Sequence, residues 1–166
     1  MTSVEEKSRR LYYKSFLKVV RNSVGSDMFR NFYVETPGKG EFDALDDGGN
    51  SCAFYVSCVL VIFKKISAVH GLVGSVVEDL KKSGWIEVKQ PKAGDVLVWE
   101  AQEFPDGLHE HIGFYVSNNR AVSTSRSKKA PIEHDINFGE DKRKIVQILR
   151  MEDWHDDRSN QSSDPR

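Results

Sequence analysis

The order of the sequence patterns predicts an α+β fold, in which helices come first and an antiparallel sheet follows. As far as about residue 82 the apolar residues favour helices, and from Trp85 onward short strand-like runs are separated by turn residues. The chain has 166 residues, enough for one domain with a substantial core but too few for two. Hydrophobic residues make up 39% and charged residues 30%, which is typical of a globular protein.

The first expected element is an amphipathic helix over residues 3–23. Its apolar residues fall on one face and its basic residues lie largely around them, so we expect it to pack on the domain as part of an N-terminal helical arm, residues 1–36. A basic helix on a membrane surface is the alternative. Gly25 ends the helix, and residues 37–50, which are rich in Gly and Asp, are expected to form a loop.

Two more helices are expected before the sheet. Residues 51–67 hold apolar residues too densely for a single stripe, which predicts a helix buried on most sides. Ser75 and Glu78 have the Ser-x-x-Glu spacing of a capping box, so a short helix should follow as far as Lys82. The Ser-Gly pair after it then ends that helix.

Five segments from Trp85 onward are expected to be strands, and a Ser-Asn-Asn turn joins the third and fourth as a hairpin. These segments are 85–88, 95–99, 111–116, 120–125 and 144–150. The main domain would then span residues 37–152. The tail, residues 153–166, is rich in Asp, Ser, Asn and Arg and should be disordered.

Composition and charge argue against several classes of function. The net charge of −1 gives no global attraction to nucleic acid. The longest apolar run, Val59 to Phe63, is far too short to cross a bilayer, so no membrane span is expected. Residues 1–10 lack the apolar core of a signal peptide. A cytoplasmic protein is therefore the default expectation, with export by a non-classical route as the alternative.

The two cysteines, Cys52 and Cys58, occupy different positions in the second expected helix. Their spacing places them on different faces, so no disulfide between them is expected. Cys58, in mid-helix, fits a buried core residue. Cys52 stands at the first turn, where unpaired backbone N–H groups and the positive end of the helix dipole favour the thiolate. Cys52 is therefore the candidate nucleophile.

His111 opens an expected strand, where an imidazole on a stiff support could act as a base for Cys52. Its neighbour His109 would point to the same face of that strand. Such a His-x-His pair can bind zinc, and Cys52 or His134 could add a ligand. No Cys-x-x-Cys or His-Glu-x-x-His spacing supports a metal site, however.

Three short segments occur in a fixed order along the chain. They are Gly-Gly-Asn-Ser-Cys-Ala-Phe-Tyr-Val-Ser at 48–57, Lys-Ala-Gly-Asp-Val-Leu-Val-Trp at 92–99 and His-Ile-Gly-Phe-Tyr-Val at 111–116. Together they resemble the signature blocks of NlpC-type cysteine peptidases and the related CHAP amidases, over about residues 40–150. The resemblance implies a compact papain-like fold, in which a helix delivers the cysteine to an antiparallel sheet that carries the histidine.

By this resemblance Cys52 is the nucleophile and His111 the general base, which later donates a proton to the leaving amine. These families place a third polar residue about twelve positions after the histidine, usually His, Asn, Asp or Glu, to hold the imidazole tautomer. Here that position is Ser123, which stabilises an imidazolium much less than a carboxylate would. His134 or Asp135 could supply the third group instead, although the first expectation for His134 is a surface position on a connecting loop.

Two further matches concern structure and the oxyanion. Gly94 and Asp95 match family positions with a structural task, a tight start to a strand and hydrogen bonds to nearby backbone N–H groups. The families tend to place a tyrosine shortly before the cysteine, where this chain has Phe42. The oxyanion hole would then use the backbone N–H of Cys52 and a second donor that the sequence does not identify.

Three functions follow from these patterns. The leading hypothesis is a thiol hydrolase that cleaves peptide or amide bonds, with peptidoglycan stem peptides or related peptides as substrates and no cofactor. The second is a papain-like domain of little activity that binds a ligand or partner, which Ser123 in the third position favours. The third is a zinc-binding module that uses His109, His111 and Cys52.

Overall fold

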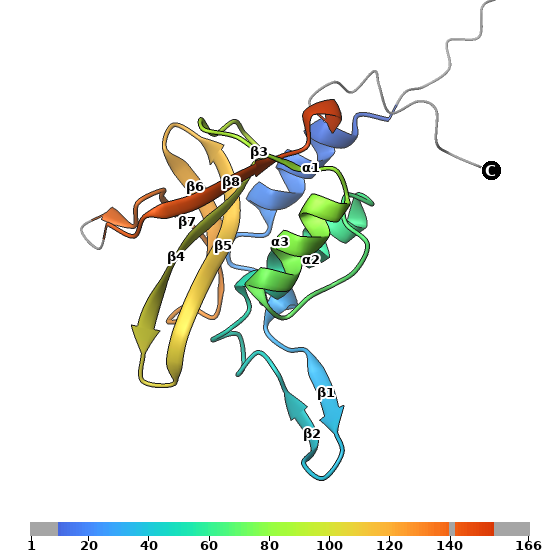
Figure 1. Cartoon of the computed structure of the whole chain (residues 1–166), viewed down its shortest axis with the longest axis vertical. Helices are drawn as coiled ribbons and strands as arrows, with labels where there is room; N and C mark the ends of the chain where they lie inside the picture. Colours follow the sequence, from blue (N-terminus) through green and yellow to red (C-terminus); the bar gives the residue numbers. More distant parts are fainter. Residues whose placement is uncertain (1–9, 140–141, 155–166) are drawn as a thin grey trace, which may run out of the picture.

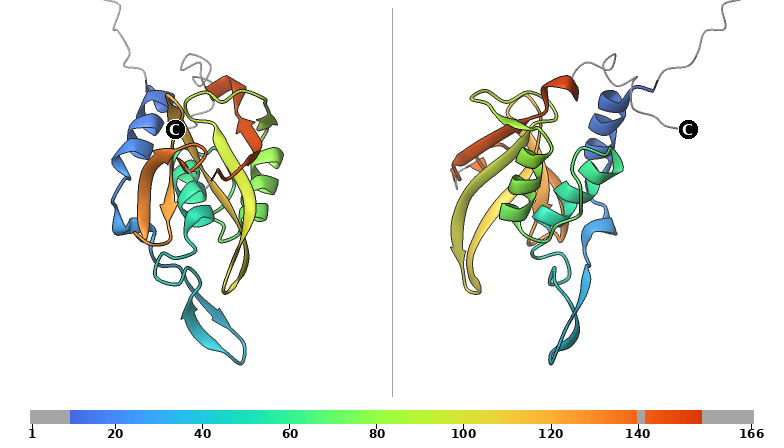
Figure 2. Two further views of the ribbon diagram at one scale, coloured as in Figure 1. Left: turned by 90° about the vertical axis from the view of Figure 1, so that its left-hand side faces the viewer. Right: turned by 45° about the vertical axis from the view of Figure 1, so that its right-hand side comes forward.

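The computed structural model describes residues 10–139 and 142–154, within which three α-helices cover one side of a six-stranded antiparallel sheet (Figure 1, Figure 2). The α+β class predicted from the sequence is confirmed. The helices are α1 (Tyr12–Asn22), α2 (Cys52–Ile62) and α3 (Val73–Lys82), with the short 3-10 helices η1 (Asp27–Phe29) and η3 (Glu152–Trp154).

The sheet has the strand order β3-β8-β4-β5-β6-β7. Strands β4 to β7 follow one another as a meander, and β8 returns to pair with β4. A separate hairpin of β1 (Tyr33–Thr36) and β2 (Gly40–Asp43) projects from the body of the protein (Figure 1). The strands of the large sheet are β3 (Ile86–Glu87), β4 (Val96–Phe104), β5 (Gly107–Ser117), β6 (Arg120–Ser125), β7 (Ala130–Asp135) and β8 (Ile145–Arg150).

Helix α2 packs on β5 and β6 of the sheet and also contacts α1 and α3, each of which reaches β5 as well. It is buried on most sides, as the density of its apolar residues predicts. Phe16 and Val20 of α1 are fully buried in the same core cluster, so the apolar face of α1 packs on the domain. Phe16 stands edge-on to Phe114 of β5, with ring centroids 5.3 Å apart.

Helix α2 ends at Ile62 and not at residue 67, because the chain turns there in a Schellman motif. Lys64 takes a left-handed φ of 54°, and its N–H donates to the carbonyl oxygen of Val61 at 2.9 Å. The N–H of Lys65 donates to the carbonyl oxygen of Leu60, also at 2.9 Å. Glycine usually occupies the left-handed position, so a lysine there gives no stop signal in the sequence.

Two segments expected to be loops contain strands. Residues 37–50 include β2, which pairs with β1 around a turn at Gly38, where φ is +82°. The boundary expected between residues 36 and 37 therefore falls inside this hairpin. Strand β7 was missed because Pro131, its second residue, cannot donate to a strand ladder. This strand forms one edge of the sheet, a position where proline is tolerated.

Strands β4 and β5 are longer than expected and form one hairpin, with an irregular register between Trp99 and Gln102. In contrast, β3 is shorter than the segment 85–88 predicted for it. The extension matters for function, because it places His111 within β5 and not at its start.

The expected disordered tail contributes a core residue. Trp154 is 2% exposed, and its ring centroid lies 4.1 Å from that of Phe16. The indole ring removes a large apolar area from water when it is buried, which favours the return of the chain to the core at this point. The remainder of the tail, residues 155–166, and residues 3–9 of the first expected helix lie outside the described residues.

Gly94 and Asp95 have the structural roles expected of them. Gly94 has a φ of +90°, and an added Cβ would lie 3.0 Å from a ring carbon of Phe16. The buried carboxylate of Asp95 accepts a hydrogen bond from the N–H of Lys92 at 2.6 Å. It also pairs with the guanidinium of Arg150 at 2.6 Å, so it joins the start of β4 to the end of β8.

Membrane-crossing segments are absent from the helices that the structure describes, since none of them is both long enough and apolar enough. This agrees with the expectation from the longest apolar run of the sequence.

Candidate functional site

Cys52 and His111 line one pocket of about 860 Å³. Cys52 is the first residue of α2, His111 lies within β5, and both keep part of their surface exposed. The backbone N–H of Ile112, the residue after His111, faces the sulfur of Cys52. The structure therefore brings together the two segments that the sequence singles out.

Asp43, at the end of β2, holds the loop that leads to α2. Its carboxylate accepts hydrogen bonds from three backbone N–H groups, those of Phe32, Leu45 and Asp47. Burial alone would raise the pKa of Asp43, but these hydrogen bonds lower it to about 2. The carboxylate thus stays charged at neutral pH and fixes the approach of the chain to Cys52.

Gly48 allows this loop to pack against the end of the sheet. Its φ is +89°, and an added Cβ would lie 3.0 Å from the carbonyl oxygen of Lys129. The hydroxyl of Ser51 donates to the carbonyl oxygen of Gly48 at 3.0 Å, and the N–H of Tyr55 donates to the carbonyl of Ser51 at 2.8 Å. These contacts place Cys52 at the first turn of the helix, as its sequence context predicts.

His111 belongs to a chain of hydrogen bonds that crosses three strands. Its Nε2 lies 2.8 Å from Oγ of Ser123 on β6, and that oxygen lies 2.7 Å from Nε2 of His134 on β7. Nδ1 of His134 lies 2.7 Å from the carbonyl oxygen of Asp135. Ser123 and His134, expected as alternatives for the third group, are therefore consecutive members of one chain.

The carbonyl oxygen at the end of this chain sets the direction of every hydrogen bond in it. A carbonyl only accepts, so Nδ1 of His134 carries a proton and Nε2 of the neutral ring accepts. The donor to Nε2 is then the hydroxyl of Ser123, whose oxygen in turn accepts from Nε2–H of His111. His111 is left with an unprotonated Nδ1, as a general base requires.

The expectation of a surface loop for His134 is wrong. His134 lies in β7 and is 9% exposed, with its ring stacked on Phe138 at a centroid distance of 4.1 Å. The ring of Trp99 lies 5.4 Å from that of His111 and 5.7 Å from that of His134. Phe138 also lines the pocket, and its sequence context does not predict this, because it follows the strand in an irregular segment.

Gly113 makes room for the contact between Ser123 and His111. A Cβ added to Gly113 would lie 2.6 Å from Cβ of Ser123 and 2.7 Å from the carbonyl oxygen of Val122. Residues 111 and 113 of a strand point to the same face, so a side chain at 113 would occupy the space beneath the imidazole. This explains the glycine of the His-Ile-Gly sequence.

Burial dominates the charge state of the pair. It raises the pKa of the Cys52 thiol, although the backbone N–H groups of Ile112 and Ala53 and the charge of Arg143 favour the thiolate. Burial, followed by the charges of Arg143 and His134, lowers the pKa of His111 to about 3. At neutral pH the pair therefore rests as a thiol and a neutral imidazole, and not as the thiolate expected from the helix position alone.

Arg143 is a member of the pocket that the sequence analysis missed. It is 6% exposed, and its guanidinium donates to the carbonyl oxygens of Glu100 at 2.8 Å and His109 at 2.6 Å. In the sequence it stands between Lys142 and Lys144, where it looks like part of a solvated basic run. Only the tertiary structure distinguishes it from its neighbours.

The histidines proposed as zinc ligands have separate partners. His109 also lines the pocket, but its Nε2 lies 3.2 Å from a carboxylate oxygen of Asp106, whereas His111 contacts Ser123. Within residues 10–139 and 142–154, His, Cys, Asp and Glu side chains form no group of three that could hold a metal ion. Cys58 does not line the pocket, and burial raises its pKa to about 11.

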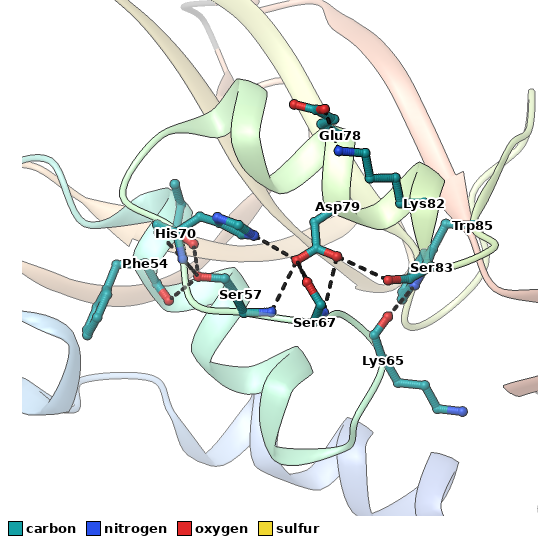
Figure 3. A network of polar contacts seen from close by, with 12 residues as sticks. Phe54, Ser57, Lys65, Ser67, His70, Glu78, Asp79, Lys82, Ser83 and Trp85 are labelled. Carbon is teal, nitrogen blue, oxygen red and sulfur yellow. Dashed lines mark hydrogen bonds and ion pairs between the residues drawn. The ribbon is translucent and has the colours of Figure 1, made fainter.

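A second polar network holds one wall of the pocket (Figure 3). Asp79 of α3 accepts hydrogen bonds from the N–H and hydroxyl of Ser67, and its Oδ2 lies 2.7 Å from Nε2 of His70. Burial alone would raise the pKa of Asp79, but these bonds hold it well below its usual range. The network ties the segment before α3 to that helix, and Gly71 and Leu72 in this segment line the pocket.

No protein-family model matches this chain, and a comparison with curated proteins also finds no match. The functional assignment therefore rests on the residues of the site and their geometry.

Proposed function

We propose that this protein is a thiol hydrolase that cleaves peptide or amide bonds through an acyl-enzyme on Cys52. The observation that carries the proposal is the pairing of Cys52 with His111 in one pocket, where the hydrogen-bond chain through Ser123 leaves Nδ1 of His111 unprotonated. A nucleophile, a base and a group that orients the base are the parts that acyl transfer needs.

The reaction begins from the neutral pair. The sulfur of Cys52 attacks the carbonyl carbon while its proton moves to Nδ1 of His111. The tetrahedral intermediate collapses when the C–N bond breaks, and His111 returns the proton to the leaving amine. Water then attacks the thioester, again giving a proton to His111, and Cys52 is released as the thiol. Each proton taken by His111 is returned within the same half-reaction.

A papain-like arrangement is consistent with the order of the elements. A buried helix begins with the cysteine and packs on an antiparallel sheet whose β5 carries the histidine. The sequence resemblance to NlpC-type and CHAP enzymes suggests peptidoglycan stem peptides or related peptide amides as the substrate class. Because one fold can host different activities, the substrate class must be tested on the protein itself.

A second candidate function is a binding module of little hydrolase activity. It is favoured by the charge state of the pair, in which both the thiol and the imidazole are neutral. It is also favoured by the serine in the chain, because a hydroxyl stabilises an imidazolium less than a carboxylate does. Such a module would bind a peptide in the same pocket without turning it over.

A panel of peptide amides and muropeptides, incubated with the parent, Cys52→Ala and Cys58→Ala, separates the two candidates. The hydrolase proposal predicts release of an amine by the parent and by Cys58→Ala, with loss of turnover in Cys52→Ala. Peptidyl chloromethyl ketones should alkylate Cys52 at a rate that depends on His111. If the parent neither hydrolyses these compounds nor is alkylated in this way, but still binds peptides, the protein is a binding module.

A further inference from the structure

Arg143 brings a positive charge into the pocket of Cys52 and His111, and no carboxylate of the described residues lies at ion-pair distance from it, although the charge of Glu100 acts on it from farther away. Two of its nitrogens are held by backbone carbonyl oxygens, Nε by Glu100 and Nη2 by His109. Nη1 has no hydrogen-bond partner within residues 10–139 and 142–154, and it is not sealed from solvent. Only 6% of the surface of Arg143 is exposed.

Such a cation is costly unless something neutralises it. Removing a guanidinium from water without a counter-ion is unfavourable, and two neutral carbonyl oxygens offset that cost only in part. The other arginine that lines the pocket, Arg126, differs in this respect, because it is more exposed and pairs with Asp106. Arg143 is thus held rigidly in place with a donor still available.

The free donors of Arg143 suit one kind of ligand. Nη1 and the second N–H of Nη2 form a planar fork, which matches the two oxygens of a carboxylate. Because backbone carbonyls already fix the guanidinium, little side-chain entropy is lost when a ligand binds. Arg143 lines the same pocket as Cys52 and His111, so a ligand held by the fork would share that pocket with the reacting atoms.

We propose that Arg143 binds a free carboxylate of the substrate beside the bond that Cys52 attacks. The substrate class is then a peptide or amino-acid amide with an acidic group close to the scissile bond. This assignment rests on the proposed function for the reaction, but the anion site itself is testable without turnover.

The test compares two alkylating reagents of nearly equal size, iodoacetate and iodoacetamide. Each forms a C–S bond with Cys52 and releases iodide, and only iodoacetate carries a carboxylate. The full-length protein reacts with each reagent and is then digested, and mass spectrometry of the peptides gives the alkylation rate at Cys52. Each rate is expressed relative to that of glutathione in the same tube. We expect the iodoacetate-to-iodoacetamide ratio at Cys52 to exceed that of glutathione about tenfold, as one charged hydrogen bond would produce.

Arg143→Gln should reduce this ratio to that of glutathione, while the control Arg120→Gln, at an arginine that pairs with Glu133 and does not line the pocket, should leave it unchanged. If Arg143→Gln instead slows both reagents equally, Arg143 acts on the thiolate alone and the carboxylate site is refuted. An unchanged ratio in Arg143→Gln refutes it as well.

A second measurement needs only the parent protein, and so does not depend on whether the variant folds. N-acetylglycine and N-acetylglycinamide compete with iodoacetamide for the pocket. The acid should protect Cys52 at a concentration about tenfold lower than the amide does. Equal protection by the two compounds overturns the proposal.

The two proposals fail in different ways. If Cys52 never forms an acyl-enzyme but iodoacetate is still preferred, the hydrolase function falls and the anion site stands. If amides are hydrolysed with no preference for an acidic group, the hydrolase function stands and the role of Arg143 falls.

Discussion

Ser123 joins two neutral histidine rings, and this limits how much charge the site can hold. A carboxylate in that position would favour an imidazolium at His111, whereas a hydroxyl offers only a dipole. The nearby charge of Arg143 disfavours the imidazolium further. Proton transfer from Cys52 to His111 must therefore accompany attack on the substrate and does not precede it.

Ser123→Ala tests the hydrogen-bond chain at the scale of one residue. The substitution leaves Nε2 of His134 without its donor and His111 without its acceptor, which should destabilise the protein by about 1–3 kcal/mol. With the tautomer of His111 no longer fixed, kcat/KM should fall on the order of 10²-fold. Ser127→Ala, in the turn after β6 and outside the pocket, removes a contact with Ser125 and is the control. Equal behaviour of the two variants in urea unfolding and activity would refute the role of the chain.

The pH dependence of activity follows from the pKa of His111. A base must be unprotonated, and a pKa of about 3 keeps His111 neutral from pH 7 down to pH 5. On an uncharged substrate, the acidic limb of kcat/KM should therefore lie below pH 5. An acidic limb near pH 6.5, the ordinary value for histidine, would contradict this charge state.

The elements that form the site differ in how well the sequence predicts them. Helix α2 was predictable at its start, because small polar residues precede a dense apolar run, but its end was not, since Lys64 takes the left-handed position usual for glycine. Strand β7 was concealed by Pro131. The position of His134 could therefore not be predicted, because its role depends on pairing between β6 and β7.

Gly113→Ala tests how closely β5 and β6 must approach. The added methyl group would meet Cβ of Ser123 and a backbone oxygen, so the strands must shift, at a cost of about 1–3 kcal/mol. Gly74→Ala in α3 is the control, because nothing lies within 4 Å of the added atom and alanine favours a helix. Thermal unfolding should show a lower Tm than the parent for Gly113→Ala but not for Gly74→Ala. An unchanged Tm in Gly113→Ala would contradict this close packing of β5 on β6.

At the scale of the whole molecule, the fold class and the pairing of Cys52 with His111 could be predicted from sequence patterns, whereas the charge of the pocket could not. Arg143 lies in a run of basic residues that has no local signature, and its burial results from the return of β8 beside β4. Burial of the thiol and the imidazole likewise depends on the assembled core. Local position favours a thiolate, and the tertiary structure overrides it.

The buried histidines should also make the stability of the molecule depend on pH. Above pH 6.5 they are neutral in both the folded and the unfolded chain. As the pH falls from 6.5 towards 4, the unfolded chain binds protons at His111 and His134, whose pKa values are lowered in the fold, so stability decreases.

Each such histidine can contribute a slope of at most about 1.4 kcal/mol per pH unit. Urea unfolding at several pH values should show a smaller slope for His111→Gln than for the parent. Identical slopes would mean that His111 takes up its proton equally well in the folded protein.

The pre-steady-state reaction with p-nitrophenyl acetate shows whether Cys52 is a nucleophile activated by His111. We expect a burst of one nitrophenol per protein molecule, with the acetyl group located on Cys52 by mass spectrometry. The acylation rate should fall on the order of 10²-fold in His111→Ala and stay unchanged in Cys58→Ala. A burst that His111→Ala leaves unchanged, or an acetyl group located elsewhere, would mean that His111 does not activate Cys52 as the nucleophile.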